Sequence, residues 1–126
     1  MVKILVVDDS IIMRNIVKNT FASLKVPFDC LEAENGNQAL QLLESNNITI
    51  VFLDWNMEGM DGIEFLKVVR AMPKYKSLPI VMVTSEKGKF SVIKALKSGA
   101  TDYIVKPVIE KVFKNKVTEL LVLARD

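Results

Sequence analysis

At 126 residues, 50% of them hydrophobic, the chain has enough apolar material for one well-packed domain and no room for a second. A formal net charge of +2 with scattered basic residues argues against nucleic-acid binding. No apolar run approaches the ~20 residues of a membrane span, and no signal-peptide pattern precedes the first strand, so we expect a cytoplasmic protein.

The residue types present also restrict the chemistry. The chain has no histidine and one cysteine, so an internal disulfide, a cysteine metal cage, a Ser-His-Asp mechanism and a histidine metal site are excluded. Any phosphohistidine involved in its function must come from a partner. The remaining metal ligands are oxygens, which suit magnesium, manganese or calcium better than zinc or copper.

The N-terminal half alternates short apolar runs with helical periodicity. Apolar runs predict strands at residues 3–7 and 48–53, and residues 28–33 are expected to form a short strand between them. Ser10 is a suitable N-cap for a helix that ends before Pro27, and residues 36–44 predict a second helix. Because the runs are continuous rather than alternating with polar residues, we expect strands buried on both faces, as in a parallel sheet.

The C-terminal half repeats this pattern. It predicts strands at residues 80–83 and 102–105, and helices at residues 61–72, 87–97 and 109–124. Residues 73–79 form a polar connection, and Gly99 can supply a left-handed C-cap. Five strand–helix pairs predict one α/β domain, a doubly wound five-stranded parallel sheet with helices on both faces.

Short apolar runs end the first, third, fourth and fifth predicted strands, and polar residues that can carry chemistry follow each run. They are Asp8 and Asp9 after the first strand, Asp54 after the third, Thr84 after the fourth, and Lys106-Pro107 after the fifth. Because the carboxyl ends of parallel strands line one crevice, we expect three carboxylates, a hydroxyl and an ammonium to meet there. Such a cluster can hold a hard divalent cation, offer a carboxylate nucleophile and bind a phosphoryl group. We interpret the chain as a phosphorylatable switch.

Each of these residues also has a plain structural interpretation. Asp8 and Asp9 can form the acidic start of a helix, and Asp54 can cap the loop that follows it. Thr84 is a common residue type in strands, and a lone lysine such as Lys106 is usually solvated. Their convergence on one edge of the sheet favours the functional interpretation.

The same residues resemble a response-regulator receiver domain. The resemblance rests on Asp8-Asp9, on the segment from Asp54-Trp55-Asn56-Met57 to Asp61-Gly62, on Thr84 and on Lys106-Pro107. It covers essentially the whole chain and implies one receiver domain over residues 1–126, with a flavodoxin-like fold of strand order 2-1-3-4-5. The Asp-Trp-Asn-Met segment without an output domain is most similar to the CheY-like chemotaxis members of the family.

For the site, the resemblance implies that Asp54 accepts a phosphoryl group from a kinase phosphohistidine. Asp8, Asp9, Asp54 and the backbone carbonyl of Asn56 would hold Mg²⁺. Lys106 and Thr84 would bind the phosphoryl oxygens that the metal leaves free. The corresponding Lys-Pro bond of receivers is cis.

The resemblance also implies a switch and an output surface. Thr84 would swing toward the phosphoryl group while Tyr103 moves inward, and Asn56 and Glu86 would tune the phosphoryl lifetime. We expect a mixed apolar and basic partner face on the fourth helix, fifth strand and last helix. Its members are Lys89, Phe90, Val92, Tyr103, Val112 and Lys116.

The implied partners are a CheA-like histidine kinase, a flagellar motor switch protein and, as an option, a phosphatase. The chain itself would be a monomer that promotes its own phosphorylation and dephosphorylation without being a turnover enzyme. One departure from the family is Glu58, which stands where such receivers commonly have proline. We expect it to change the magnesium affinity, in a direction that the sequence does not decide.

Other functions remain open at this point. The chain can be a stand-alone receiver in a phosphorelay outside chemotaxis, or a scaffold that keeps the fold without phosphorylation. A haloacid dehalogenase-like phosphohydrolase would need an acidic residue where Asn56 stands. A flavodoxin-like cofactor binder would need a glycine- and hydroxyl-rich phosphate loop where Asp8 and Asp9 stand.

Overall fold

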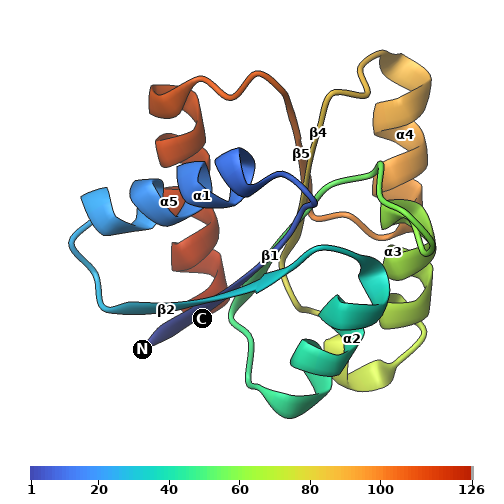
Figure 1. Ribbon diagram of the computed structural model, residues 1–126, viewed down its shortest axis with the longest axis horizontal. Coiled ribbons are helices and arrows are strands. Elements are labelled where there is room, and N and C mark those ends of the chain that lie inside the picture. The colour runs from blue at the N-terminus through green and yellow to red at the C-terminus, as the bar shows by residue number, and fades with distance from the viewer. Residues whose placement is uncertain (126) are drawn as a thin grey trace.

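The computed structural model describes residues 1–125 and the side chains of residues 1–122. Within this range, parallel strands form one five-stranded sheet in the order β2-β1-β3-β4-β5 (Figure 1). The strands are β1 (Val2–Val7), β2 (Phe28–Ala33), β3 (Ile50–Leu53), β4 (Ile80–Thr84) and β5 (Asp102–Val105). The predicted fold class and strand order are confirmed.

Helices cover both faces of the sheet, α1 and α5 on one side and α2, α3 and α4 on the other (Figure 1). They are α1 (Ile11–Ser23), α2 (Gly36–Ser45), α3 (Gly62–Arg70), α4 (Lys89–Ser98) and α5 (Glu110–Arg125), with a short 3₁₀ helix, η1 (Pro73–Tyr75), before β4. In the part of the chain that is described, no helix combines the length and the apolar character that crossing a membrane requires.

The alternating side chains of the central strands divide the core into two layers. Ile4 and Val6 of β1 pack in the layer beneath α1 and α5, whereas Leu5 and Val7 pack in the layer beneath α2, α3 and α4. The strands β3 and β4 contribute to both layers in the same way. Burial on both faces explains why the sequence shows continuous apolar runs here instead of alternation.

Single residues set several helix limits. Ser10 caps α1 as predicted, with its hydroxyl accepting the Met13 N–H at 3.3 Å. The helix predicted from residue 87 begins instead at Lys89, because Gly88 has a φ of 112° that no helical residue adopts. Gly99 ends α4 with a φ of 117°, the predicted left-handed C-cap.

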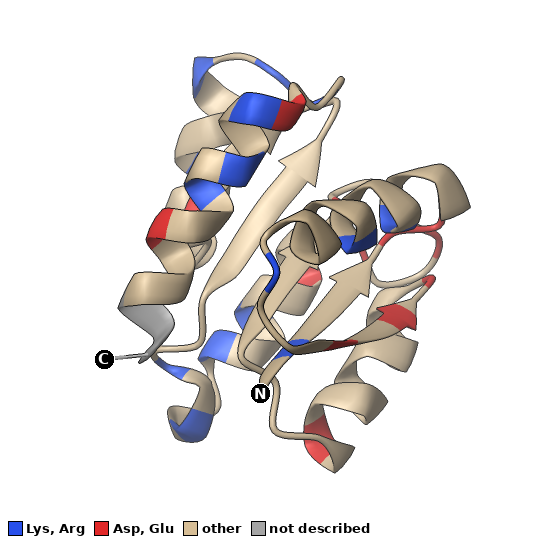
Figure 2. Cartoon of the chain, turned by 90° about the vertical axis from the view of Figure 1, so that its left-hand side faces the viewer, with Lys and Arg blue, Asp and Glu red and all other residues tan. Residues whose placement is uncertain are grey.

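Charged residues of both signs share the surface. On the side that carries α1 and α5, basic and acidic positions are interspersed, and both signs occur along α5 (Figure 2). This distribution agrees with the small net charge of +2. It supports the expectation that the chain does not bind nucleic acid, which stays a prediction.

Gly62 allows the loop after β3 to fold back against the strand end. A Cβ at this position would lie 2.5 Å from the backbone oxygen of Asp54 and 2.8 Å from the Cα of Trp55. We expect Gly62→Ala to lower the free energy of unfolding by about 1–3 kcal/mol, because backbone atoms must move to admit the methyl group. Urea denaturation measures this loss.

Gly36 supplies a matched control, since it is also a buried first residue of a helix. The three atoms nearest to its added Cβ all belong to the Met60 side chain, at 2.9–3.0 Å. Because a methionine side chain repacks readily, Gly36→Ala should cost about 1 kcal/mol or less. Equal losses in the two variants would contradict the proposed backbone clash at Gly62.

Candidate functional site

The ends of β1 and β3 bring three carboxylates together. The two strands are neighbours with Val7 in register with Leu53, so the next residues, Asp8 and Asp54, lie at the same level of the sheet. The Asp54 N–H donates to the Val7 carbonyl at 2.9 Å and continues this pairing. Carboxylate oxygens of Asp8, Asp9 and Asp54 all lie within 4.8 Å of one another.

The three carboxylates differ in burial. Asp8 and Asp54 are only 2% and 7% exposed, whereas Asp9 is exposed to solvent. A set of oxygen ligands with one side open to water suits a hard divalent cation that keeps part of its hydration shell. The donor set therefore fits Mg²⁺. The backbone carbonyl of Asn56, expected as a further ligand, lies on the loop that follows Asp54.

Lys106 supplies the positive charge of this cluster from the end of β5. Its Nζ donates to Oδ2 of Asp8 at 2.9 Å and lies 3.5 Å from Oδ2 of Asp54. The Lys106 N–H donates to the Thr84 carbonyl at 2.8 Å, so the loop after β5 continues the pairing with β4. The peptide bond to Pro107 is cis, as the resemblance implied.

The negative charge of Asp54 is only partly compensated by its surroundings. Burial raises the pKa of its carboxyl group above the ordinary value, and the negative charge of Asp8 raises it further. Lys106, the Thr84 side chain and the Trp55 N–H act in the opposite direction but do not outweigh these effects. The Trp55 N–H donates to Oδ1 of Asp54 at 2.8 Å.

Glu86 joins three of the predicted residues on the rim of the site. Its N–H donates to the Thr84 hydroxyl at 3.3 Å, and its carbonyl accepts the Tyr103 hydroxyl at 2.5 Å. Its carboxylate accepts the side-chain amide of Asn56 at 3.1 Å. Burial, followed by the charges of Glu86 and Asp54, raises the pKa of Tyr103. The loop after β4 is thus tied to the loop after β3 and to β5 through one residue.

The expected partner face is only partly exposed. Phe90 and Val112 are 88% and 51% exposed, and Lys89 is exposed too. Val92 and Tyr103 are half-buried. Tyr103, Val112 and Lys116 line a hollow of about 170 Å³ between β5 and α5. The Lys116 ammonium contacts Asp102 at 3.0 Å, so its charge is already paired.

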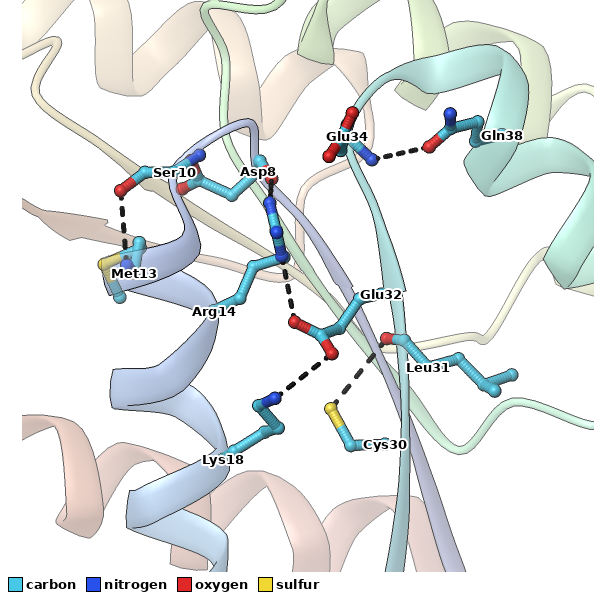
Figure 3. A network of polar contacts seen from close by, with 10 residues as sticks. All are labelled: Asp8, Ser10, Met13, Arg14, Lys18, Cys30, Leu31, Glu32, Glu34 and Gln38. Carbon is cyan, nitrogen blue, oxygen red and sulfur yellow. Dashed lines mark hydrogen bonds and ion pairs between the residues drawn. The ribbon is translucent and has the colours of Figure 1, made fainter.

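Sequence reasoning passed over Arg14, whose guanidinium contacts the backbone of Asp8 (Figure 3). A signal was present, because Arg14 lies beside Met13 and one turn before Val17 on the buried side of α1. A cation at such a position requires a nearby carboxylate or carbonyl. Its partner Glu32 lies on β2 and could be identified only once the strand pairing was known.

Comparison with known proteins agrees with this geometry. A family model for the response regulator receiver domain matches residues 4–118. The chain is 50% identical over 120 residues to a chemotaxis protein CheY homolog of Campylobacter jejuni, covering 94% of this chain and 92% of that protein. It is 48% identical over 120 residues to chemotaxis protein CheY1 of Helicobacter pylori, covering 94% and 96%.

A solved structure shows the same fold. The chemotaxis response regulator CheY4 of Vibrio cholerae superimposes with a TM-score of 0.86 at 32% sequence identity, covering 96% of this chain and 99% of that one. The family model, this relative and this structure agree on the receiver family, and not on a haloacid dehalogenase-like phosphohydrolase or a flavodoxin-like cofactor binder.

The raised pKa of Asp54 predicts how Asp54→Asn changes stability without metal. At pH values below the ordinary value of 3.8, the carboxyl is protonated in both the folded and unfolded states, and the substitution has little effect. As pH rises through the raised pKa, the wild-type fold must hold an unfavourable charge. Asp54→Asn should then be the more stable protein, by on the order of 1 kcal/mol at pH 7.

Urea denaturation in the presence of a chelator between pH 3 and pH 7 measures this difference. Asp29→Asn is the matched control, because Asp29 is exposed on β2 and its substitution should change stability little across the range. An advantage of Asp54→Asn that stays constant or shrinks as pH rises would contradict the account.

Proposed function

The chain belongs to the response regulator receiver family, and we propose that it is a two-component switch activated by phosphorylation of Asp54. The main support for this proposal is that three carboxylates and the Lys106 ammonium lie together at the ends of the strands. The identity of about half the residues with CheY-type relatives supports a role in chemotaxis. A stand-alone receiver in another phosphorelay remains the alternative.

In the proposed reaction, a carboxylate oxygen of Asp54 attacks the phosphorus of a phosphohistidine, the bond from phosphorus to the imidazole breaks, and an acyl phosphate forms. Asp8, Asp9, Asp54 and the Asn56 carbonyl would hold Mg²⁺. This ion would neutralise charge on the phosphoryl oxygens. Lys106 lies 3.5 Å from Asp54, within reach of a phosphoryl oxygen, and the buried Thr84 hydroxyl is a further donor.

Phosphorylation is proposed to shift a balance between two packings rather than to create a new fold. The Thr84 hydroxyl accepts a hydrogen bond from Glu86, and the Tyr103 hydroxyl donates one to the same residue. A Thr84 hydroxyl that turns to a phosphoryl oxygen loses its contact with the Glu86 N–H, so the loop before α4 is released and rearranged. This gives the site a physical route to the partner face.

The proposed partners follow from the site and from the exposed face. Because the chain has no histidine, the phosphoryl donor is a separate histidine kinase. A flagellar motor switch protein is the proposed output partner, bound at α4, β5 and α5. We propose that residues 1–126 act as a monomeric single receiver domain in the cytoplasm, as a signalling switch and not a turnover enzyme, with a phosphatase as an optional partner.

The phosphoryl lifetime is proposed to depend on two rim residues. Asn56 and Glu86 are hydrogen-bonded to each other at 3.1 Å, and such a pair can orient or obstruct an attacking water molecule. Glu58 is exposed and lies outside the carboxylate cluster. Its effect on magnesium affinity stays a prediction, and a Mg²⁺ titration of Glu58→Pro tests it, since an unchanged affinity would contradict the expectation.

Incubation with acetyl phosphate and Mg²⁺ tests the proposed chemistry. We expect intact mass spectrometry to show one phosphoryl adduct on the wild type, lost in Asp54→Asn and in the presence of a chelator, because both nucleophile and metal are required. Asp29→Asn should still form the adduct. A wild type without an adduct, or an adduct that persists in Asp54→Asn, would refute Asp54 as the phosphoacceptor.

Phe90→Ala tests the partner face. Because Phe90 is 88% exposed, its loss should leave stability unchanged while weakening phosphorylation-dependent binding to a flagellar motor switch protein by about tenfold. Val68→Ala is the control, since Val68 is an exposed apolar residue on α3, outside the proposed face. Calorimetry measures both affinities, and an equal loss in the two variants would argue against this face.

A further inference from the structure

Arg14 is a buried cation that contacts the backbone of the candidate metal site. It lies on α1 and is 8% exposed. Its Nη1 donates to the backbone carbonyl oxygen of Asp8 at 2.8 Å, while its Nε donates to Oε1 of Glu32 at 2.9 Å (Figure 3). One guanidinium group therefore joins the end of β1 to the edge strand β2.

Glu32 is itself held in place. Its second carboxylate oxygen accepts a hydrogen bond from the Lys18 ammonium at 3.1 Å. Two cationic side chains of α1, those of Arg14 and Lys18, therefore contact this carboxylate together. Glu32 is exposed, and slight desolvation of its carboxyl opposes ionisation, but the hydrogen bonds from Lys18 and Arg14 outweigh that effect and lower the pKa of Glu32. An ionised Glu32 keeps the guanidinium directed between β2 and the Asp8 carbonyl.

The carbonyl that Arg14 contacts belongs to the peptide between Asp8 and Asp9. The Asp8 N–H is fixed on the other side, since it donates to the Ala33 carbonyl of β2 at 3.0 Å. The Asp8 carboxylate is held by the Ser10 N–H at 2.9 Å and by Lys106. Among the described residues, no ion pair restrains the exposed Asp9 carboxylate, so its position depends on the orientation of this peptide.

We propose that Arg14 is a positioning residue of the metal site, with its guanidinium, anchored by Glu32, holding the Asp8–Asp9 peptide so that both carboxylates face Asp54. This role rests on the proposed function, in which these carboxylates hold Mg²⁺. Outer groups that orient metal ligands commonly change metal affinity by about 10–100-fold when replaced.

A lysine at this position would keep the charge and lose the geometry. The guanidinium presents Nε and Nη1 in a fixed planar fork that reaches two acceptors at once, whereas an ammonium is a single point on a flexible stem. Arg14→Lys therefore separates positioning from simple charge. Glu32→Gln leaves Arg14 in place and removes the charge that directs it.

The test is a Mg²⁺ titration followed by the fluorescence of Trp55, the only tryptophan, and repeated by calorimetry. We expect Arg14→Lys to raise the dissociation constant about tenfold and Glu32→Gln to raise it severalfold. The double variant should bind no more weakly than Arg14→Lys alone, because both substitutions break one chain of contacts. Denaturation without metal shows that each variant is folded under the titration conditions.

Glu34→Gln is the matched control for charge. Glu34 lies two residues beyond Glu32 and is exposed, and its carboxylate makes no ion pair with the described residues. Its substitution should leave the dissociation constant within about twofold of the wild type, since Glu34, although exposed like Glu32, has no ion pair that connects it to Arg14.

The outcomes separate the two proposals. A wild type that binds Mg²⁺ no better than Arg14→Lys and Glu32→Gln would overturn the positioning role alone. If Glu34→Gln weakened Mg²⁺ binding as much as Glu32→Gln does, the positioning role would also be overturned, because the loss of one negative charge would then account for the weaker binding. A wild type without magnesium affinity would overturn the proposed function and this role with it. If Arg14→Lys fails to fold, the Mg²⁺ dissociation constants of Glu32→Gln and Glu34→Gln still test the positioning role.

Discussion

The fold places two buried carboxylates, those of Asp8 and Asp54, side by side at the centre of the site. Asp8 and Asp54 follow neighbouring central strands, so the parallel pairing of β1 with β3 forces them together. Burial and mutual repulsion make this arrangement costly, and the raised pKa of Asp54 expresses that cost. The ammonium group of Lys106, which follows β5, compensates part of this negative charge. A bound cation would complete the neutralisation, so the proposed metal binding and the proposed phosphoryl chemistry would have a common origin in the fold.

The sheet order explains how a small domain gathers these groups. The two strands that separate β5 from β1 are β3 and β4, yet the Lys106 side chain crosses to Asp8 because all the strand ends open on one edge. The loop after Asp54 returns closely over the same edge, and only a residue without a side chain fits where Gly62 lies. The rim residue Glu86 then connects the end of β4 to Tyr103 of β5.

Much of this could be predicted from the sequence because it depends on local patterns. Continuous apolar runs identified the buried strands, and the polar residues after them identified Asp8, Asp9, Asp54, Thr84 and Lys106 as neighbours. The contacts of Arg14 with Glu32, of Tyr103 with Glu86 and of Lys116 with Asp102 could not be predicted in this way. Each joins segments whose separation in space is known only once the helices and strands are packed.

Chemistry at Asp54 is proposed to be coupled to the face formed by α4, β5 and α5. Amide NMR spectra of the wild type and Asp54→Asn, recorded with Mg²⁺ before and after addition of acetyl phosphate, test this coupling most directly. We expect acetyl phosphate to shift the resonances of Glu86, α4 and Tyr103 in the wild type and to leave those of Asp54→Asn unchanged. Shifts confined to the residues around Asp54, with α4 and β5 unaffected, would contradict the claim that this chain is a switch.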